Sequence, residues 1–175
     1  MRVAEGFEAG VIDNRSTPHC RVQSVPIVDV TILGGFWKPR MEANRLRGIP
    51  RLLQLLEEHG IVDNFRRVSK RKEAVRRGPL FTDSDLYKWM EGAAFVLQSS
   101  KDAELDSTLD RMIDEVVAAQ GPDGYLNTYF VDEHASERYT KFAHNHEFYC
   151  AGHLIQAAIT HFRATGKRNL LDCAA

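Results

Sequence analysis

The sequence predicts a mainly α-helical protein built of helical hairpins, with a short β segment ahead of them. Three observations lead to this class. Apolar residues recur at helical spacing in four separate stretches, the connections between them alternate between short turns and longer loops, and Val and Ile gather in one stretch near the amino terminus. Such alternation is expected of stacked helical hairpins, which have tight turns at one rim and longer loops, free to build a site, at the other.

The amino-terminal part is expected to precede the helices. Residues 1–20 show little periodicity and predict a poorly ordered leader. Residues 21–33, "RVQSVPIVDVTIL", are rich in Val and Ile with partial alternation, which favours a strand that Pro26 interrupts. The following "GGFW" ends the strand, so that the predicted β segment spans residues 21–36.

The first helix is predicted from Lys38 to His59, where apolar residues recur at roughly helical spacing. Pro50 is expected to begin a turn of this helix or to kink it, and Gly60 supplies the stop. The basic run "RRVSKRKEAVRR" then predicts a solvated loop within residues 61–80, because no aromatic residues interleave with the charges as they do in a nucleic-acid patch.

Stronger helical patterns follow. The stretches "DSDLYKWMEGAAFVLQSS" and "DAELDSTLDRMIDEVVAAQ" each place apolar residues on one face, and the first opens with Asp and Ser in capping positions. "GPDGYLNTYF" breaks the pattern, and another helix is predicted from about Asn145 to Thr165. After Gly166, "KRNLLDCAA" begins a helix that the sequence does not complete, so residues 37–175 are expected to form an incomplete helical domain.

Composition excludes several classes of protein. The 175 residues, 43% hydrophobic and 27% charged, suit about one globular domain, and no stretch approaches the roughly 20 apolar residues of a membrane span. A net charge of -1 argues against binding to nucleic acid or anionic lipid. The start, "MRVAEGFEAG", has acids where a signal peptide is basic, so a cytoplasmic location is expected. Cys20, Cys150 and Cys173 are odd in number and far apart, which predicts thiols.

The stretch "HNHEFYCAGHLIQAAITHF" gathers four of the seven histidines. On a helix, His146, Cys150 and His153 share one face, a ligand set that zinc accepts, but they span about 10 Å, too far for one tetrahedral ion. We therefore predict no metal site within this helix. His153 and His161 are expected to be packed residues with local partners, whereas His144 and His146 lie at the helix start, where a site built from loops would converge.

Three motifs carry a family resemblance. "FTDSDLYKWMEGAAFVL", "QGPDGYLNTYF" and "HNHEFYCAGHLIQAAITHFRATG", in this order and preceded by "VTILGGFWKPRME", resemble the N-terminal part of glycoside hydrolase family 127, the β-L-arabinofuranosidases. The resemblance covers residues 27–175. It implies that the hairpins are the first part of an (α/α)6 barrel, the family's catalytic domain, and that the β segment belongs with β-sandwich domains outside this sequence. Family members are several times longer than this chain.

The resemblance also implies candidate sugar-binding residues. His146, in "HEFY", matches a family histidine that contacts the sugar in the innermost subsite, where an imidazole can exchange a hydrogen bond with a ring hydroxyl. Other matched positions lie near the rim of the family's pocket, where each is as suited to fixing loop and helix packing as to touching sugar: Asp85, Tyr87 and Lys88 in "SDLYKW", and Tyr125 and Asn127 in "DGYLN". An aromatic ring such as that of Tyr125 could stack on a sugar face, whereas Trp89 is expected to lie in the core.

The family's chemistry, as the resemblance implies it, is a retaining double displacement with a zinc-held cysteine thiolate as nucleophile and a glutamate as general acid/base. Those residues and the zinc ligands come from the C-terminal half of the barrel. No catalytic residue, metal ligand or cofactor is therefore assigned to this chain, and Cys150, Cys173 and Glu147 are not given these roles, although zinc is expected in the full-length family.

Three hypotheses follow. In the first, the chain is an N-terminal fragment of a glycosidase that carries part of the pocket for an L-arabinofuranose-containing oligosaccharide or glycoconjugate and is inactive alone. In the second, it is a non-catalytic helical module that binds a carbohydrate or a protein. In the third, the chain belongs to the same helical ring, but the reaction is that of a related hydrolase or sugar epimerase. An incomplete barrel also predicts self-association through its open apolar faces.

Overall fold

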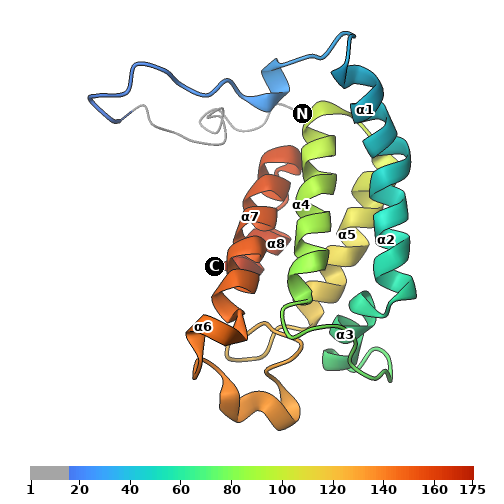
Figure 1. Ribbon diagram of the computed structural model, residues 1–175, viewed down its shortest axis with the longest axis vertical. Helices are drawn as coiled ribbons and strands as arrows, with labels where there is room; N and C mark the ends of the chain where they lie inside the picture. The colour runs from blue at the N-terminus through green and yellow to red at the C-terminus, as the bar shows by residue number, and fades with distance from the viewer. Residues whose placement is uncertain (1–15) are drawn as a thin grey trace.

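In the computed structural model, helix α4 (Asp83–Ser99) lies in the middle of the helical stack (Figure 1). Helix α2 (Ile49–Glu58) lies on one side of it, α7 (Glu147–Thr165) on the other, and α5 (Ala103–Ala118) and α8 (Asn169–Ala174) behind. Helices α4 and α7 run in the same direction, and α2, α5 and α8 run opposite to them. The chain therefore alternates up and down, as the prediction of helical hairpins requires.

The connections between the helices alternate in length, as predicted. Residues 100–102 and 166–168 form short turns at one end of the stack. Residues 69–82 and 119–146 form long loops at the other end, and the second loop contains a short 3-10 helix, η3 (Asp132–Glu137). We call the end that carries the two long loops the loop end.

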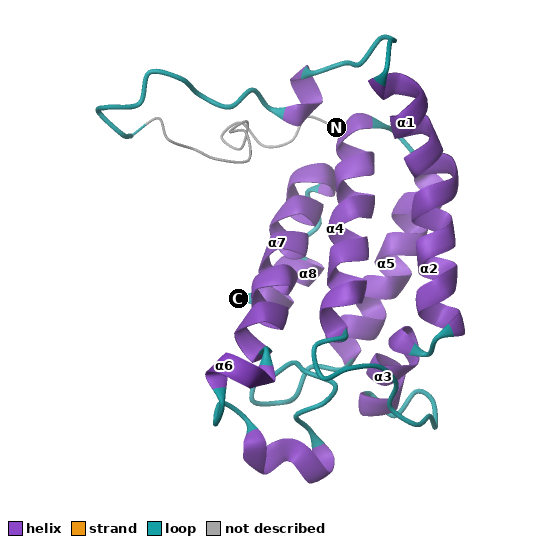
Figure 2. Ribbon diagram, in the orientation of Figure 1, coloured by secondary structure: helices purple, strands orange, loops and turns teal. Residues whose placement is uncertain are grey.

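The predicted β segment is wrong. The structure describes residues 16–175, so most of the predicted leader lies outside it, and residues 21–36 contain no strand but a 3-10 helix, η1 (Ile27–Asp29) (Figure 2). Val22 and Leu33 are 78% and 82% exposed, because none of residues 16–175 forms a strand that packs beside this segment. A β ladder requires a partner for its backbone hydrogen bonds, and high β-propensity alone does not supply one.

The helix predicted from Lys38 to His59 is present as one nearly continuous helical run. Helix α1 (Trp37–Ala43) passes through a π-helical turn, η2 (Asn44–Gly48), into α2. Pro50 lies in the first turn of α2, and the π-helical turn before it accommodates the missing amide hydrogen.

A helix that the sequence analysis missed, α3 (Ile61–Val68), fills the first part of the predicted loop at 61–80. Val62 and Phe65 are 0% exposed on this helix. The charges of the basic run obscured these apolar positions, which lie at helical spacing. Gly60, with φ of 73°, makes the left-handed turn from α2 into α3.

The later helices are confirmed, with two differences at their starts. The fully buried carboxylate of Asp83 does not cap α4; it accepts hydrogen bonds from the hydroxyl and from the amide of Thr128, the latter at 2.7 Å. Helix α7 begins after His146, whose left-handed backbone separates it from the short helix α6 (Phe142–Asn145).

The hydrophobic core forms where α4 packs against its neighbours. Trp89 belongs to it, as predicted, and its indole Nε1 donates to the carbonyl oxygen of Ile49 at 2.9 Å. Among residues 16–175, no helix combines the length and the apolar character that crossing a lipid bilayer requires. Among the described residues, the core side chains with no exposed surface come from five helices, α3, α4, α5, α7 and α8: Val62, Phe65, Leu86, Met90, Ala93, Ala94, Leu109, Ile113, Val116, Ala157, Ala158 and Leu170.

Arg66 on α3 joins three helices through ion pairs. Its guanidinium donates to Glu57 at 2.7 and 2.9 Å, and to Asp63 and Glu115 at 3.0 Å each. Glu57 lies on α2 and Glu115 on α5, so one side chain that is only 21% exposed links α2, α3 and α5.

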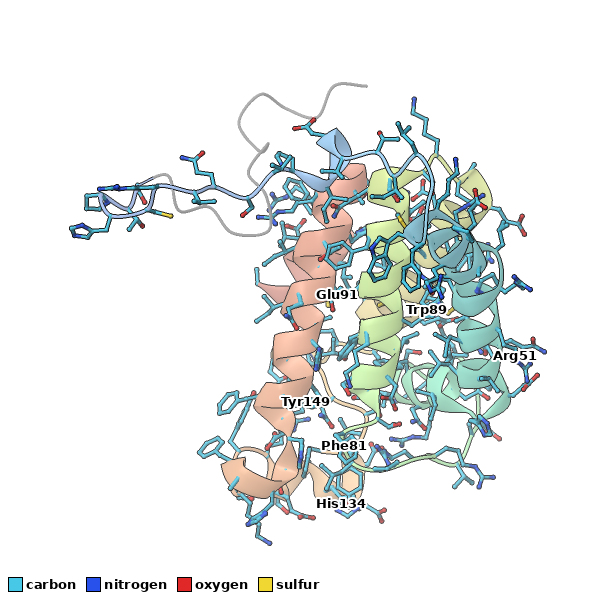
Figure 3. The ribbon with its side chains drawn as sticks, turned by 45° about the horizontal axis from the view of Figure 1, so that its top comes forward. Arg51, Phe81, Trp89, Glu91, His134 and Tyr149 are labelled. Atoms are coloured by element: carbon cyan, nitrogen blue, oxygen red, sulfur yellow. The ribbon has the colours of Figure 1, made fainter. Side chains whose placement is uncertain are left out.

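Replacing Arg66 with methionine is expected to lower the free energy of unfolding by about 2 kcal/mol, because three carboxylates lose a shared partner. Urea unfolding followed by circular dichroism measures this loss. The matched control is Arg51→Met, which breaks an exposed pair with Glu58 on the outer surface at 3.3 Å (Figure 3). Exposed pairs contribute about 0–1 kcal/mol, so equal losses in the two variants would contradict the assignment.

Lowering the pH is expected to remove the stabilisation that the ion pairs of Arg66 provide. Burial alone raises the pKa of Asp63, but hydrogen bonds from Lys72 and Arg66 outweigh burial and hold that pKa below its ordinary value. The pKa of Glu115 is likewise lowered against burial by Arg71 and Arg66. Carboxylates of this kind stabilise the fold above their unfolded pKa and lose that effect as the pH falls through the folded pKa. The stability difference between wild type and Arg66→Met should therefore be constant near neutral pH and shrink below about pH 4, as measured by urea unfolding.

Candidate functional site

The two long loops converge on the first turns of α4 and α7. Phe81 in one loop and His134 in the other lie at the loop end, and Tyr149 lies on the first turn of α7 (Figure 3). Loops held at the ends of a rigid helical scaffold commonly build sites, so the loop end is where polar groups are expected to converge.

His146 occupies the turn from α6 into α7, with φ of 57°. Its Nδ1 lies 2.6 Å from the carbonyl oxygen of His144. Because a carbonyl oxygen only accepts, Nδ1 carries the hydrogen, and in the neutral ring Nε2 is left as an acceptor. The exposed imidazole lies 5.1 Å from the ring of Phe81 and 5.8 Å from that of Tyr149, centre to centre.

Lys88 on α4 reaches across to α7. Its Nζ donates to the hydroxyl of Tyr149 at 2.7 Å and to Ser84 Oγ at 3.2 Å, and it lies 3.9 Å from the carboxylate of Asp85. Asp85, Lys88, His146 and Tyr149 thus form one exposed surface, which we call the His146 face. It presents hydrogen-bond donors and acceptors beside an aromatic ring.

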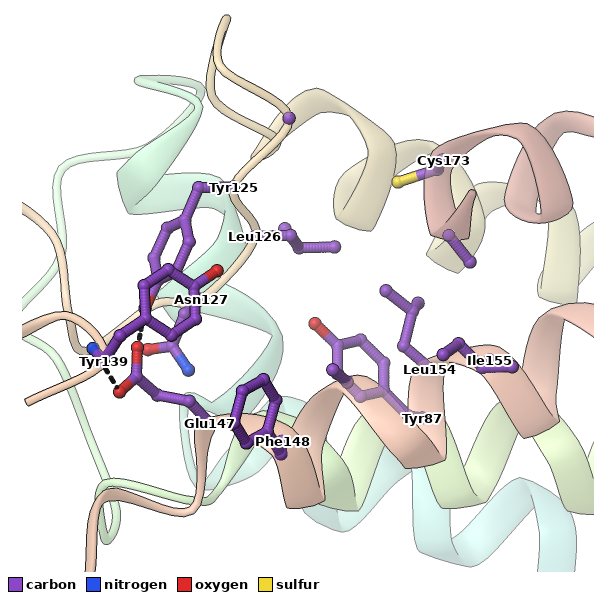
Figure 4. A pocket seen from close by; sticks show the side chains of 13 residues that line it. Tyr87, Tyr125, Leu126, Asn127, Tyr139, Glu147, Phe148, Leu154, Ile155 and Cys173 are labelled. Carbon is purple, nitrogen blue, oxygen red and sulfur yellow. Dashed lines mark hydrogen bonds between the residues drawn. The ribbon is translucent and has the colours of Figure 1, made fainter. Parts of the chain in front are cut away.

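A cavity of about 160 Å³ lies on a different side of α7, bounded by α7, α8 and the loop at 119–146 (Figure 4). Tyr87 of α4 and Cys173 of α8 are buried in its floor, whereas Tyr139 and Phe148 at its mouth are 51% and 63% exposed. We call this cavity the Tyr87 pocket. The hydroxyl oxygen of Tyr87 has no hydrogen-bond partner among the described residues.

Glu147, the first residue of α7, ties two loop segments to the helix. Its Oε1 accepts from the hydroxyl of Tyr125 at 2.6 Å, and its Oε2 accepts from the backbone amide of Tyr139 at 2.8 Å (Figure 4). Burial, followed by the hydrogen bond to Glu147, raises the pKa of Tyr125 well above its ordinary value, so the phenol remains a donor. The guanidinium of Arg138 covers the ring of Tyr125 at 3.9 Å.

The structure divides the six predicted sugar-binding residues between two surfaces. Three lie on the His146 face and three line the Tyr87 pocket: Asp85, Lys88 and His146 on the first, and Tyr87, Tyr125 and Asn127 in the second. The side chain of Asn127 fixes the loop, because its Oδ1 accepts from the amides of Tyr129 and Phe130 at 2.8 and 2.9 Å.

Sequence reasoning did not identify Tyr139, Glu147 or Tyr149 as parts of these surfaces. "HEFY" itself contains Glu147 and Tyr149, so their position beside His146 was the available signal. For Tyr139 no comparable signal exists, because its hydrogen bond to Glu147 comes from the backbone amide, which any residue except proline supplies.

The two other histidines of α7 are packed, as predicted, but their polar partners are weaker than expected. The ring of His153 meets that of Tyr149 edge to face at 4.6 Å, and its Nδ1 has no hydrogen-bond partner among the described residues. His161 is 0% exposed, and its Nε2 lies 3.4 Å from Thr165 Oγ1. Burial lowers the pKa of His161 and favours the neutral ring.

One acidic cluster has metal-like spacing. Asp106, Asp110 and His161 offer ligand atoms within 4.8 Å of one another. Lys167 already donates to Asp106 at 2.7 Å and to Asp110 at 2.6 Å, so an ammonium group neutralises the two carboxylates. The cluster is therefore explained as an ion-pair network between α5 and the turn after α7.

The cysteines do not suit a zinc–thiolate centre. Burial raises the pKa of Cys150 to about 12 and also raises the pKa of Cys173, so both remain thiols near neutral pH. Zinc binds cysteine as the thiolate, and no cysteine belongs to a cluster of metal-like spacing within residues 16–175.

Comparisons with known proteins agree on one family. A family model described as the catalytic domain of GH127 β-L-arabinofuranosidases matches residues 29–175. The non-reducing end β-L-arabinofuranosidase of Bifidobacterium longum subsp. longum is 38% identical over 101 residues, which make up 55% of this chain and 15% of that protein.

Two solved structures show the same helical arrangement. A GH127 β-L-arabinofuranosidase from Geobacillus stearothermophilus T6 matches with a TM-score of 0.80 and 38% identity, over 83% of this chain and 24% of that one. Another GH127 β-arabinofuranosidase matches with a TM-score of 0.77 and 35% identity, over 85% and 25% of the two chains. The chain thus spans about a quarter of each solved relative, and its helices form part of an α/α barrel, as predicted.

Replacing Glu147 with alanine is expected to loosen the loop end. The amide of Tyr139 loses its acceptor, so its hydrogen exchange should accelerate at least about tenfold, and the free energy of unfolding should fall by about 1–3 kcal/mol. Exchange followed by NMR measures the first effect. Glu133→Ala, at a carboxylate whose side chain is 88% exposed in the same loop, is the control. An unchanged exchange rate at Tyr139 in Glu147→Ala would contradict the role of Glu147.

Proposed function

The chain belongs to the GH127 family of β-L-arabinofuranosidases, and on this premise we propose that its His146 face is part of a sugar-binding pocket of a glycosidase. The observation that carries the proposal is the hydrogen bond from His146 Nδ1 to the carbonyl oxygen of His144. It holds the exposed imidazole in one orientation and leaves Nε2 as an acceptor for a sugar hydroxyl.

The other groups of the His146 face complement this acceptor. Lys88 supplies a donor that Tyr149 and Ser84 hold in place, and Asp85 supplies a carboxylate beside it. A sugar ring offers several hydroxyls that both donate and accept, together with an apolar C–H face. The ring of Phe81, next to His146, provides an apolar surface for that face.

The substrate class that we propose is a non-reducing terminal β-L-arabinofuranoside, since the curated relative is named for that activity. We propose that this chain binds the sugar without cleaving its bond. The family's zinc–thiolate chemistry needs clustered ligands, and within residues 16–175 neither Cys150 nor Cys173 belongs to a cluster of metal-like spacing. The nucleophile, the general acid/base and the zinc ligands would then come from the part of the family's domain that the chain does not match.

One side of α7 exposes apolar side chains, as expected of a chain that forms only part of a domain. Phe148, Ile155 and Ile159 are exposed along this helix, and an apolar surface of this kind favours association, so we propose self-association of the chain. Binding without cleavage also describes a non-catalytic carbohydrate module. A cytoplasmic location is proposed because Cys150 and Cys173 are free thiols.

Substituting His146 with alanine is expected to weaken the binding of methyl β-L-arabinofuranoside about tenfold, because one hydrogen bond and one ring contact are lost. NMR titration of the purified chain measures the dissociation constants. His59→Ala, an exposed histidine at the C-terminal end of α2, is the matched control and should bind like wild type. Equal affinities in all three proteins would exclude His146 as a sugar contact.

The absence of hydrolysis has its own test. Wild-type protein incubated with 4-nitrophenyl β-L-arabinofuranoside should release no 4-nitrophenol above the uncatalysed rate. Release that scales with protein concentration would show that the chain holds a complete catalytic set, and binding without release would support the binding role.

A further inference from the structure

The carboxylate of Asp85 on the His146 face has one hydrogen-bond donor within residues 16–175, the hydroxyl of Thr82 at 3.0 Å. Lys88 is the charged group beside it, but its Nζ lies 3.9 Å away, which is too long for a hydrogen bond. A side chain that is 45% exposed samples several rotamers unless a contact holds it. The hydroxyl of Thr82 is therefore the contact that fixes the orientation of this carboxylate.

The hydroxyl of Thr82 is not used to cap α4. Thr82 is the N-cap residue, where a threonine oxygen ordinarily accepts a hydrogen bond from an amide of the first turn, but it makes no such bond here. The amide of Ser84 donates instead to the carbonyl oxygen of Phe81 at 3.1 Å (Figure 3). The amide of Asp85 donates to the carbonyl oxygen of Thr82 at 2.9 Å. Because backbone carbonyl groups satisfy these amides, the hydroxyl of Thr82 is free to donate to the carboxylate of Asp85.

Thr82 is itself held firmly in place. It is 1% exposed, and its amide donates to the carbonyl oxygen of Pro79 at 3.1 Å. Its side chain packs directly on the backbone of Gly78, where an added Cβ atom would lie only 2.7 Å from Thr82 Oγ1. The next residue, Asp83, is anchored by the amide of Thr128 at 2.7 Å. Contacts on both sides of Thr82 thus restrict its hydroxyl to one position, as a group that orients another must be.

The restriction matters for binding because a ligand has to immobilise every mobile side chain that it contacts. A carboxylate already held in one orientation accepts a hydrogen bond from a sugar hydroxyl without losing further rotamer freedom. Thr82 is buried and does not reach the His146 face, so any effect of its hydroxyl on a bound sugar must pass through Asp85.

We propose that Thr82 is a positioning residue of the His146 face and that its hydroxyl holds the carboxylate of Asp85 ready to accept a hydrogen bond from a sugar hydroxyl. The inference rests on the proposed function for the identity of the ligand. The orientation of Asp85, by contrast, is a property of the chain alone and can be measured without sugar.

The first test measures that orientation. Three-bond couplings between the Hα and Hβ protons of Asp85, measured by NMR, should report a single χ1 rotamer in the wild-type chain and an average over rotamers in Thr82→Val. Valine keeps the shape of threonine and removes the hydroxyl. Thr82→Ser keeps the hydroxyl and should restore the wild-type couplings. Averaged couplings in the wild type, or wild-type couplings in Thr82→Val, would overturn the proposal.

The second test measures binding of methyl β-L-arabinofuranoside by NMR titration. Thr82→Val should weaken it about threefold and Thr82→Ser should leave it unchanged. The matched control is Thr160→Val, at a threonine of α7 that is 6% exposed and donates its hydroxyl to the carbonyl oxygen of Gln156 at 2.8 Å. This control should lose comparable stability in urea unfolding and keep wild-type affinity. Equal weakening in Thr82→Val and Thr160→Val would show a general structural effect and overturn the proposal.

A double-mutant cycle tests whether Thr82 acts through Asp85. In the background of Asp85→Ala, Thr82→Val should weaken binding no further. A further threefold loss would show that the hydroxyl acts by another route and would overturn the proposal. If the wild-type chain does not bind the sugar at all, the proposed function fails, and the couplings of Asp85 still decide whether Thr82 positions it.

Discussion

Burial of α4 on several sides is the constraint on which the rest of the structure depends. Helix α4 packs against α2, α3, α5 and α7, and Leu86, Met90 and Ala93 are 0% exposed. Because burial removes most side chains of α4 from water, its exposed charged side chains at the loop end, Asp85 and Lys88, are confined to one narrow strip. The hydrophobic core therefore determines where the polar groups of the His146 face lie.

The left-handed turn before α7 places polar side chains on two different sides of this helix. His146 adopts a left-handed backbone, which costs a residue with a side chain roughly 1–2 kcal/mol. The bond from its ring to His144 and the two bonds to the carboxylate of Glu147 offset this cost. As a result His146 and Glu147, neighbours in sequence, serve different sides of α7.

The helical spacing of apolar residues predicted the long helices, because the same apolar residues pack in the core. Trp89 is an example. Sequence reasoning missed α3, where the basic run directly follows the buried Phe65, and it predicted a strand in the Val-rich segment at residues 21–36, for which residues 16–175 supply no neighbouring strand. The candidate site was predicted as one group because its residues share motifs. Successive helical residues diverge by about 100°, so Tyr87 and Lys88 separate, and only the packing of α7 shows to which surface each belongs.

Burial also decides what chemistry these residues can perform. It raises the pKa of Tyr125 and of Cys150 and lowers that of His161, and in each case it favours the neutral form. A neutral phenol and a neutral thiol are poor nucleophiles, whereas a neutral imidazole donates and accepts hydrogen bonds and can act as a base. On the His146 face, hydrogen bonds hold Lys88, Tyr149 and the imidazole of His146 in fixed orientations, and this geometry supports the proposal that the face orients a sugar.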